Sequence, residues 1–255
     1  MIDIHCHILP GIDDGAKTIY DSVNMAKEAV QQGVTTIIAT PHHKNGQYEN
    51  EKIDILDKVT QLNEYLSNEG IPLTILPGQE VRIYGEIIED YHAGGRILPL
   101  NETNYLFIEF PSGSVPRYAE RLFFDLQTEG LIPIIVHPER NQEIIENPDF
   151  LYKFVNNGAL SQLTAGSLTG YFGKKIKKFS EQLIEADLTH FIASDAHNIR
   201  NRTFKMVEAF ETVEKKYGID TVSLFQENSE LLVQGKNVYK EIPQQVQRKK
   251  FLGLF

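Results

Sequence analysis

The chain has 255 residues, of which 41% are hydrophobic and 24% are charged, and its formal net charge is −10. This composition is typical of a globular protein with a sizeable core, and an acidic chain without a basic stripe is a poor nucleic-acid binder. An anionic substrate would need a local positive site, made by metal ions or placed arginines. We expect one domain spanning residues 1–255 in a reducing cytoplasm, because the chain shows a single cysteine, no signal peptide and no apolar run of ~20 residues.

Short β-rich apolar runs alternate along the chain with amphipathic stretches. The predicted strands are MIDIHCH (1–7), TTIIAT (35–40), LTILPGQEVRI (73–83), YLFIEF (105–110), IPIIVH (132–137), ALSQLTA (159–165) and HFIASDAH (190–197). The predicted helices cover residues 19–33, 52–70, 118–130, 151–158, 174–187, 204–218 and 220–234. This alternation predicts parallel βα units and an α/β fold, a distorted seven-stranded (β/α) barrel resembling a TIM barrel. An open doubly wound sheet is the alternative.

Histidine and carboxylate side chains fall at the C-terminal ends of these strands. They are His5 and His7 on the first strand, His42 after the second, Glu80 on the third, Glu109 on the fourth, His137 on the fifth, and Asp195 and His197 on the seventh, with Asp14 on the first βα loop. The C-terminal ends of parallel barrel strands meet at one face, where active sites are built. A single residue of this kind is usually a capping or loop residue, but the coincidence across six strands predicts a metal centre.

The only cysteine, Cys6, lies between His5 and His7. Side chains alternate along a strand, so the two histidines share one face and Cys6 points to the other, where it serves as a small buried hydrophobe. A cysteine phosphatase needs an arginine six residues after its cysteine, and Ile12 stands there instead. The sequence therefore argues against a catalytic thiolate.

Other candidate features have a simpler reading. The stretch TAGSLTGYFGKK lacks the spacing of a phosphate-binding loop, since Leu168 and Lys175 occupy positions that require Gly and Ser or Thr. His190 begins its strand, at the opposite end of the barrel, and is predicted to be structural. His92 is predicted to lie at the surface, and only one of His42 and His43 is expected to point inward.

The candidate ligands lie in a series of short motifs. In order they are D-I-H-C-H, D-D-G, T-P-H-H, G-Q-E, I-E-F, H-P-E-R and S-D-A-H. From Met1 to about Thr203 the series resembles the polymerase and histidinol phosphatase (PHP) superfamily, most closely its bacterial protein-tyrosine phosphatase branch. The resemblance implies a distorted seven-stranded barrel and a multinuclear, commonly manganese-dependent centre. It also implies removal of phosphate from tyrosine-rich tails of bacterial tyrosine kinases, in capsule and exopolysaccharide synthesis.

Histidine and carboxylate ligands suit manganese, iron or zinc. Two divalent ions would only neutralise the four candidate carboxylates, whereas three would leave a net positive centre for a phosphate dianion. We therefore expect three ions, with a dinuclear site assisted by arginines as the alternative. Arg140 offers a bidentate fork to phosphate, and Arg202 resembles a second family arginine; a surface ion pair is the simpler reading of both. Asp14 is expected to act as a ligand, a general acid, or both.

Three functions remain open at this point. The first is metal-assisted hydrolysis of phosphotyrosine in proteins, the second is a small-molecule phosphoesterase of the histidinol-phosphatase type, and the third is a non-catalytic module that binds a kinase. The third is disfavoured, because a structural metal site closes with four ligands. The C-terminal QRKKFLGLF is predicted to pack on the barrel or on a neighbouring subunit rather than to anchor in a membrane.

Overall fold

The computed structural model describes residues 1–247; the predicted packing of the basic and apolar tail falls on residues 248–255 and lies outside the described residues. Its strands are β1 (Ile2–Cys6), β2 (Thr36–Ala39), β3 (His42–His43), β4 (Thr74–Pro77), β5 (Glu80–Arg82), β6 (Tyr105–Glu109), β7 (Ile132–Val136), β8 (Leu160–Thr164) and β9 (Phe191–Ala193). The helices are α1 (Ile19–Gln31), α2 (Lys52–Asn68), α3 (Ile87–His92), α4 (Ala119–Thr128), α5 (Gln142–Glu146), α6 (Asp149–Asn156), α7 (Ala165–Thr169), α8 (Lys174–Glu185), α9 (Met206–Tyr217) and α10 (Ile219–Val233), with the 3₁₀ turns η1 (Leu100–Glu102) and η2 (Pro138–Arg140). Within residues 1–247 no helix is both long and apolar enough to cross a membrane.

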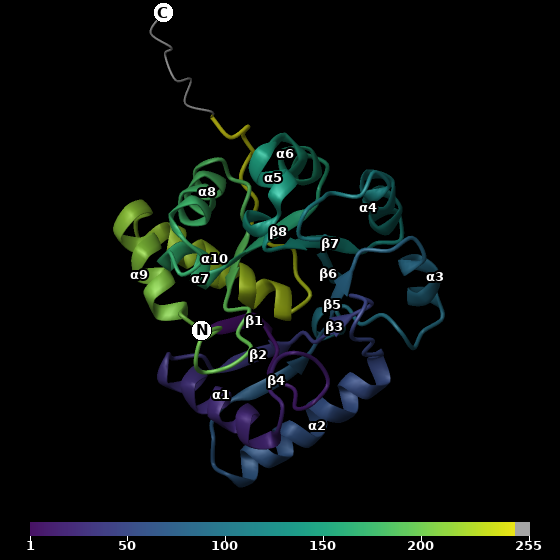
Figure 1. Ribbon diagram of the computed structural model, residues 1–255, viewed down its shortest axis with the longest axis vertical. Helices are drawn as coiled ribbons and strands as arrows, with labels where there is room; N and C mark the ends of the chain where they lie inside the picture. The colour runs from purple at the N-terminus through teal and green to yellow at the C-terminus, as the bar shows by residue number, and fades with distance from the viewer. Residues whose placement is uncertain (248–255) are drawn as a thin grey trace, which may run out of the picture.

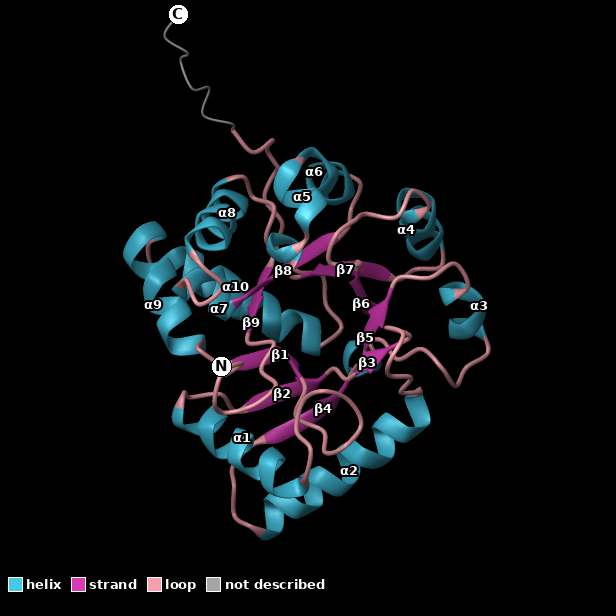
Figure 2. Ribbon diagram, viewed as in Figure 1, coloured by secondary structure: helices cyan, strands magenta, loops and turns pink. Residues whose placement is uncertain are grey.

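The strands form two parallel sheets, ordered β1-β2-β4 and β3-β5-β6-β7-β8-β9. They curve around a common interior, and most of the helices surround them (Figure 1 and Figure 2). The predicted α/β class and the parallel βα order are thus confirmed. Among the described residues, however, pairing does not run continuously around the ring, and the first and last strands meet through one isolated bridge between Cys6 and Ala196.

The third predicted strand is split into β4 and β5, and the chain after the second predicted strand forms an additional two-residue strand, β3; the break between the sheets falls at these points. Pro41 follows β2 and Pro77 ends β4, and proline cannot donate a ladder hydrogen bond. Gly78 permits the close approach at the kink, because a Cβ there would lie 2.6 Å from the Ile38 side chain. Beyond the kinks the strands resume as β3 and β5, where His42 pairs directly with Glu80. The kinks therefore bring two predicted ligands side by side.

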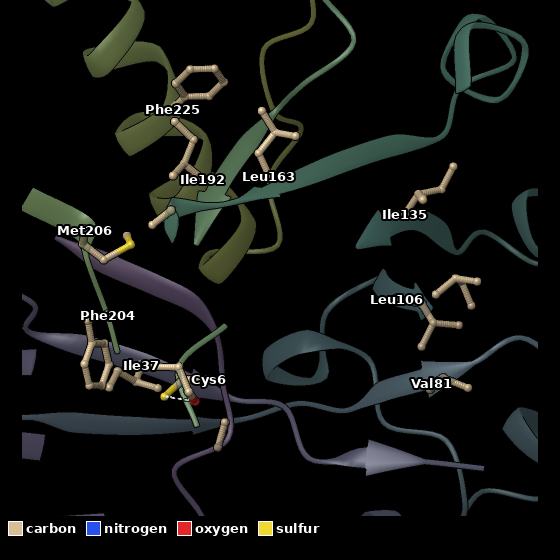
Figure 3. Close-up of a cluster of buried hydrophobic side chains, with 14 of the residues drawn as sticks. Cys6, Ile37, Val81, Leu106, Ile135, Leu163, Ile192, Phe204, Met206 and Phe225 are labelled. Carbon is tan, nitrogen blue, oxygen red and sulfur yellow. Dashed lines mark hydrogen bonds between the residues drawn. The ribbon is translucent and has the colours of Figure 1, made fainter. Parts of the chain in front are cut away.

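Hydrophobic side chains pack on both sides of the strands. The outer cluster, between strands and helices, takes at least one residue from most strands, among them Cys6, Ile37, Val81, Leu106, Ile135, Leu163 and Ile192 (Figure 3). The inner cluster includes Ile38 and Phe107 and is joined by Leu232 of α10. Burying each such side chain contributes roughly 1.5–3 kcal/mol, so both layers hold the strand ends in place.

Candidate metal centre

Ligand-type atoms gather in three overlapping groups at the C-terminal ends of the strands. The groups are His7, Asp14, His42 and His197; His5, His7 and Glu80; and His42, Glu80 and Glu109, and within each group the candidate ligand atoms lie within 4.8 Å of one another. His7, His42 and Glu80 each belong to two groups. The three groups therefore make one continuous centre rather than separate sites.

The remaining two predicted ligands border this centre. The His137 Nε2 atom lies 2.9 Å from a Glu80 oxygen, and an Asp195 oxygen lies 3.4 Å from His7 Nε2. Both residues adopt positive φ angles, 37° for His137 and 51° for Asp195, a conformation that L-residues rarely adopt. This local backbone strain is found at the ends of the strands that carry them. All nine sequence-predicted ligand residues are thus brought together.

The seam between the first and last strands aligns the ligands of both. The Asp195 amide donates to the His5 carbonyl at 2.8 Å, and the His7 amide donates to the Ala196 carbonyl at 2.9 Å. The next loop is held as tightly, since a Cβ on Gly15 would lie 2.0 Å from the His7 carbonyl oxygen. Asp14, beside that glycine, reaches within 3.3 Å of His197 Nε2. The most exposed candidate ligand is Asp14, whose side chain is 42% exposed.

Several buried atoms in the centre have no hydrogen-bond partner among the described residues. They are the Nε2 atoms of His5, His7 and His197, His42 Nδ1, and one carboxylate oxygen each of Glu80 and Glu109. Buried polar atoms are nearly always satisfied, and an unsatisfied one is costly. Imidazole nitrogens and carboxylate oxygens facing one another at these distances are the donor set that manganese, iron or zinc takes. The residues present therefore fit divalent metal ions.

The other ring nitrogens of the histidines are held by a second layer of groups. His7 Nδ1 lies 2.7 Å from an Asp13 oxygen, and His5 Nδ1 lies 2.8 Å from the Gln162 side-chain oxygen. Such contacts fix the tautomer with a proton on Nδ1, which leaves Nε2 free to bind a metal. Asp13 and Gln162 were not predicted. The adjacent aspartates of D-D-G were a usable signal for Asp13, whereas nothing near Gln162 in the sequence pointed to His5.

Burial and neighbouring charges shift the pKa values of groups in the centre in opposite directions. Burial would raise the pKa of Glu80, but His42 and His5 hold it well below its usual range. Burial and the negative charge of Glu80 raise the pKa of Glu109 to about 7. Burial and the nearby Arg140 lower the pKa of His137 to about 4. The carboxylates thus crowd one another, and positive groups are needed to keep them ionised together.

Three arginines supply part of that positive charge. Arg140 and Arg202 both reach Asp195, with nitrogen–oxygen distances of 2.5 and 3.0 Å. Arg82, which was not predicted, lies 3.0 Å from Glu109. One pocket beside the centre is lined by both predicted arginines together with His42, Glu80, Glu109, Phe110, Ser112, His137 and Asp195. A phosphate in this pocket would meet guanidinium groups as well as the ligand cluster.

The residues excluded from the site on sequence grounds are also located. Cys6 is fully buried in the outer cluster, where burial raises its thiol pKa. His190 is buried at the opposite end, and its Nδ1 accepts a hydrogen bond from the Ser161 amide. His92 is largely exposed and contacts Glu129, and the His43 ring, which belongs to none of the three ligand groups, lies 6.5 Å from the Tyr84 ring. The predicted burial of Cys6 and surface position of His92 are thus confirmed, whereas the structural role of His190 stays a prediction.

Comparison with known proteins agrees with this site. Residues 1–234 match the family model described as capsular polysaccharide synthesis, CpsB/CapC. The tyrosine-protein phosphatase YwqE of Bacillus subtilis is 54% identical over 255 residues, covering 100% of both chains, and the putative tyrosine-protein phosphatase CapC of Staphylococcus aureus is 42% identical over the same span. A structure from the crystallographic study of YwqE and Streptococcus pneumoniae CpsB, which describes them as metal-dependent tyrosine phosphatases, superposes with a TM-score of 0.95 at 54% identity, covering 97% of this chain and 100% of that one. The chain belongs to the CpsB/CapC family of capsular polysaccharide synthesis.

Proposed function

We propose that this protein is a metal-dependent phosphatase that hydrolyses phosphotyrosine in bacterial proteins, a tyrosine kinase of the capsule or exopolysaccharide machinery among them. The single observation that carries the proposal is the cluster of buried ligand atoms without hydrogen-bond partners among the described residues, next to a pocket lined by Arg140 and Arg202. The names of the relatives at 54% and 42% identity favour this substrate class over histidinol phosphate.

The metal ligands in this proposal are His5, His7, Asp14, His42, Glu80, Glu109, His137, Asp195 and His197. We assign manganese to the site, in two or three ions, although iron and zinc also fit the ligands. When bound, such ions supply Lewis-acid stabilisation of the phosphate and lower the pKa of a bound water. We further propose a single catalytic domain over residues 1–255 and a location in the cytoplasm.

The protein's own residues orient the phosphate. Arg140 and Arg202 both form ion pairs with Asp195. When these ion pairs loosen or break, the planar guanidinium groups would donate bidentate hydrogen bonds to the phosphate oxygens. The leaving phenolate is comparatively stable, because tyrosine has a pKa of ~10, so a strong general acid is not required. Asp14 borders the same space, 3.4 Å from His42 and 3.7 Å from Arg202. Because His197 and His42 hold the pKa of this carboxyl below its usual range, it would act there as a ligand carboxylate rather than as a proton donor.

Turnover of two substrates tests the proposal. A phosphotyrosine peptide and histidinol phosphate are offered to the full-length protein, with manganese and with chelator. We expect efficient turnover of the peptide only with manganese. Preferred turnover of histidinol phosphate, or peptide turnover that survives chelation, would overturn it.

A further inference from the structure

The segment between α7 and α8 borders the arginine pocket. The Arg140 guanidinium lies 5.2 Å from the centre of the Phe172 ring, within the range of a cation–π contact. Phe172 is followed by Gly173 and then by α8, which begins at Lys174. Helix α7 contacts both α8 and α9 (Figure 1). Helix α8 also contacts η2, which carries Arg140, so residues 171–175 lie at the edge of the arginine pocket.

This border is densely basic. Lys174, Lys175 and Lys177 lie in the first turn of α8, which contains no acidic residue, and none of the three has an ion pair among residues 1–247. Lys205 adds a fourth charge, with its Nζ 5.5 Å from the Tyr171 ring centre. We refer to Tyr171, Lys174, Lys175, Lys177 and Lys205 as the lysine border.

The lysines are poorly placed for stability. The N-terminus of a helix carries a partial positive charge, so cations there destabilise the helix instead of stabilising it. Among residues 1–247, the one carboxylate that forms an ion pair with the border is Glu208, 3.5 Å from Lys205. Positive charge is therefore concentrated beside the site in a chain whose net charge is −10. An acidic ligand would offset both the repulsion and the helix dipole.

We propose that the lysine border binds acidic side chains that flank the phosphotyrosine in a protein substrate, an inference that rests on the proposed function. Lys174 and Lys175 are exposed and, with the half-buried Lys177 and Lys205, supply the charge complement. Tyr171, which is 46% exposed, supplies a flat apolar contact for the peptide. The protein's overall negative charge would otherwise repel an acidic peptide. The border supplies positive charge at the edge of the pocket, against that field.

A charge-matched pair of variants tests this proposal. Lys174→Gln/Lys175→Gln removes two charges from the border. The control variant, Lys27→Gln/Lys215→Gln, removes one exposed charge from α1 and one from α9. Neither lysine has an ion pair in the part of the chain that the structure describes. The substrates are a phosphotyrosine peptide with acidic flanks, the same peptide with neutral flanks, and free phosphotyrosine.

We expect the border variant to lose roughly 3- to 10-fold in kcat/KM on the acidic peptide at low salt, mainly through KM, as two exposed ion pairs would give. The neutral peptide, free phosphotyrosine and the control variant should change less than 2-fold, and 0.5 M salt should shrink the loss. Equal losses on all three substrates, or none, would overturn the proposal. So would unchanged peptide kinetics with lost binding to phosphatidylglycerol vesicles. If wild-type protein does not hydrolyse free phosphotyrosine or either peptide, the proposed function fails instead.

Discussion

Histidines are buried at both ends of the barrel, but in different states. At the C-terminal end, the Nε2 atoms of His5, His7 and His197 face other ligand-type groups without a hydrogen-bond partner. At the opposite end, His190 Nδ1 accepts a hydrogen bond from the Ser161 amide. Burial is therefore common to both ends and does not mark function. The unsatisfied nitrogen atoms among carboxylates are what separate a ligand cluster from a structural histidine.

The two ends also differ in charge. A pocket at the His190 end is lined by Glu185, Asp187, Asp220 and Glu241, and burial together with Glu241 raises the pKa of Asp187. At the ligand end, by contrast, Arg140 and Arg202 contact Asp195 and line the pocket. Only the ligand end therefore offers a phosphate dianion both positive side chains and places for metal ions.

The largest effect should follow from removing a shared ligand. Glu80→Gln keeps the size of the side chain but loses the charge that contacts His42 and His137. We expect less metal to bind and phosphatase activity to fall by roughly 1,000-fold or more. The reason is that the charge that develops on the phosphate in the transition state would no longer be stabilised by a metal ion acting as a Lewis acid. The matched variant at the other end, His190→Gln, should keep activity within about 3-fold in the same assay at neutral pH. Equal losses in two folded variants would erase the distinction between the ends.

A smaller effect is expected from the arginine pocket. Arg140→Lys keeps the charge beside Asp195 but loses the planar fork. We expect kcat/KM to fall roughly 10- to 100-fold while metal content, measured by elemental analysis, stays at the wild-type level. Wild-type kinetics in this variant would reduce Arg140 to a structural ion pair.

At the end opposite the ligand cluster, burial of His190 should make the stability of the protein depend on pH. Burial and the positive charge of Lys240 lower the pKa of His190 to about 3, against ~6.5 in the unfolded chain. Below pH ~6.5 the unfolded chain binds a proton that the folded protein does not, so His190 lowers the free energy of unfolding as pH falls toward 3. Between pH 7.5 and 5 this amounts to about 2 kcal/mol.

His190→Gln should remove that part of the pH dependence, whatever its effect on stability at neutral pH. Denaturant unfolding of wild-type and variant protein at several pH values measures the difference. The free energy of unfolding of the wild type, minus that of the variant, should fall by about 2 kcal/mol as pH falls from 7.5 to 5, since only the wild type has the His190 contribution. Parallel curves would show that His190 has the same pKa in the folded and the unfolded protein.

The smallest effect on activity should come from Cys6→Ser. Cys6 lies in the outer cluster, where its Sγ donates to the Ala196 carbonyl at 3.5 Å, away from the ligand atoms. Activity should stay within about 2-fold of wild type, because burial raises the thiol pKa and leaves little thiolate to react. A folded but inactive serine variant would contradict the metal reading.

Much of this arrangement could be read from the sequence. Alternation along a strand separates Cys6 from His5 and His7, and the barrel rule brings distant strand ends such as Glu109 and Asp195 to one face. The split at Pro77 and Gly78 and the short strand after Pro41 were not predicted, because the close approach of Ile38 to Gly78 comes from a neighbouring strand and cannot be read from local sequence. The kinks place His42 and Glu80 in strands of their own, rather than after a strand and at the end of one.

The supporting groups were harder to predict than the ligands. Gln162 lies 157 positions from His5 in the sequence, and it contacts that ring only because β1 and β8 face the same interior. Arg82 follows Glu80 by two residues and pairs with Glu109 across the β5–β6 ladder. Such partners have no fixed spacing, so only the tertiary structure identifies them.

Anomalous scattering from a crystal of the wild-type protein grown with manganese tests the central claim most directly. The account predicts manganese peaks among the three overlapping groups, bounded by His5, Asp14, Glu109 and His197. It also predicts that no manganese binds at the His190 pocket. A crystal with no manganese at these groups, or with manganese only elsewhere, would contradict the claim that the unsatisfied atoms at the C-terminal end form the metal centre.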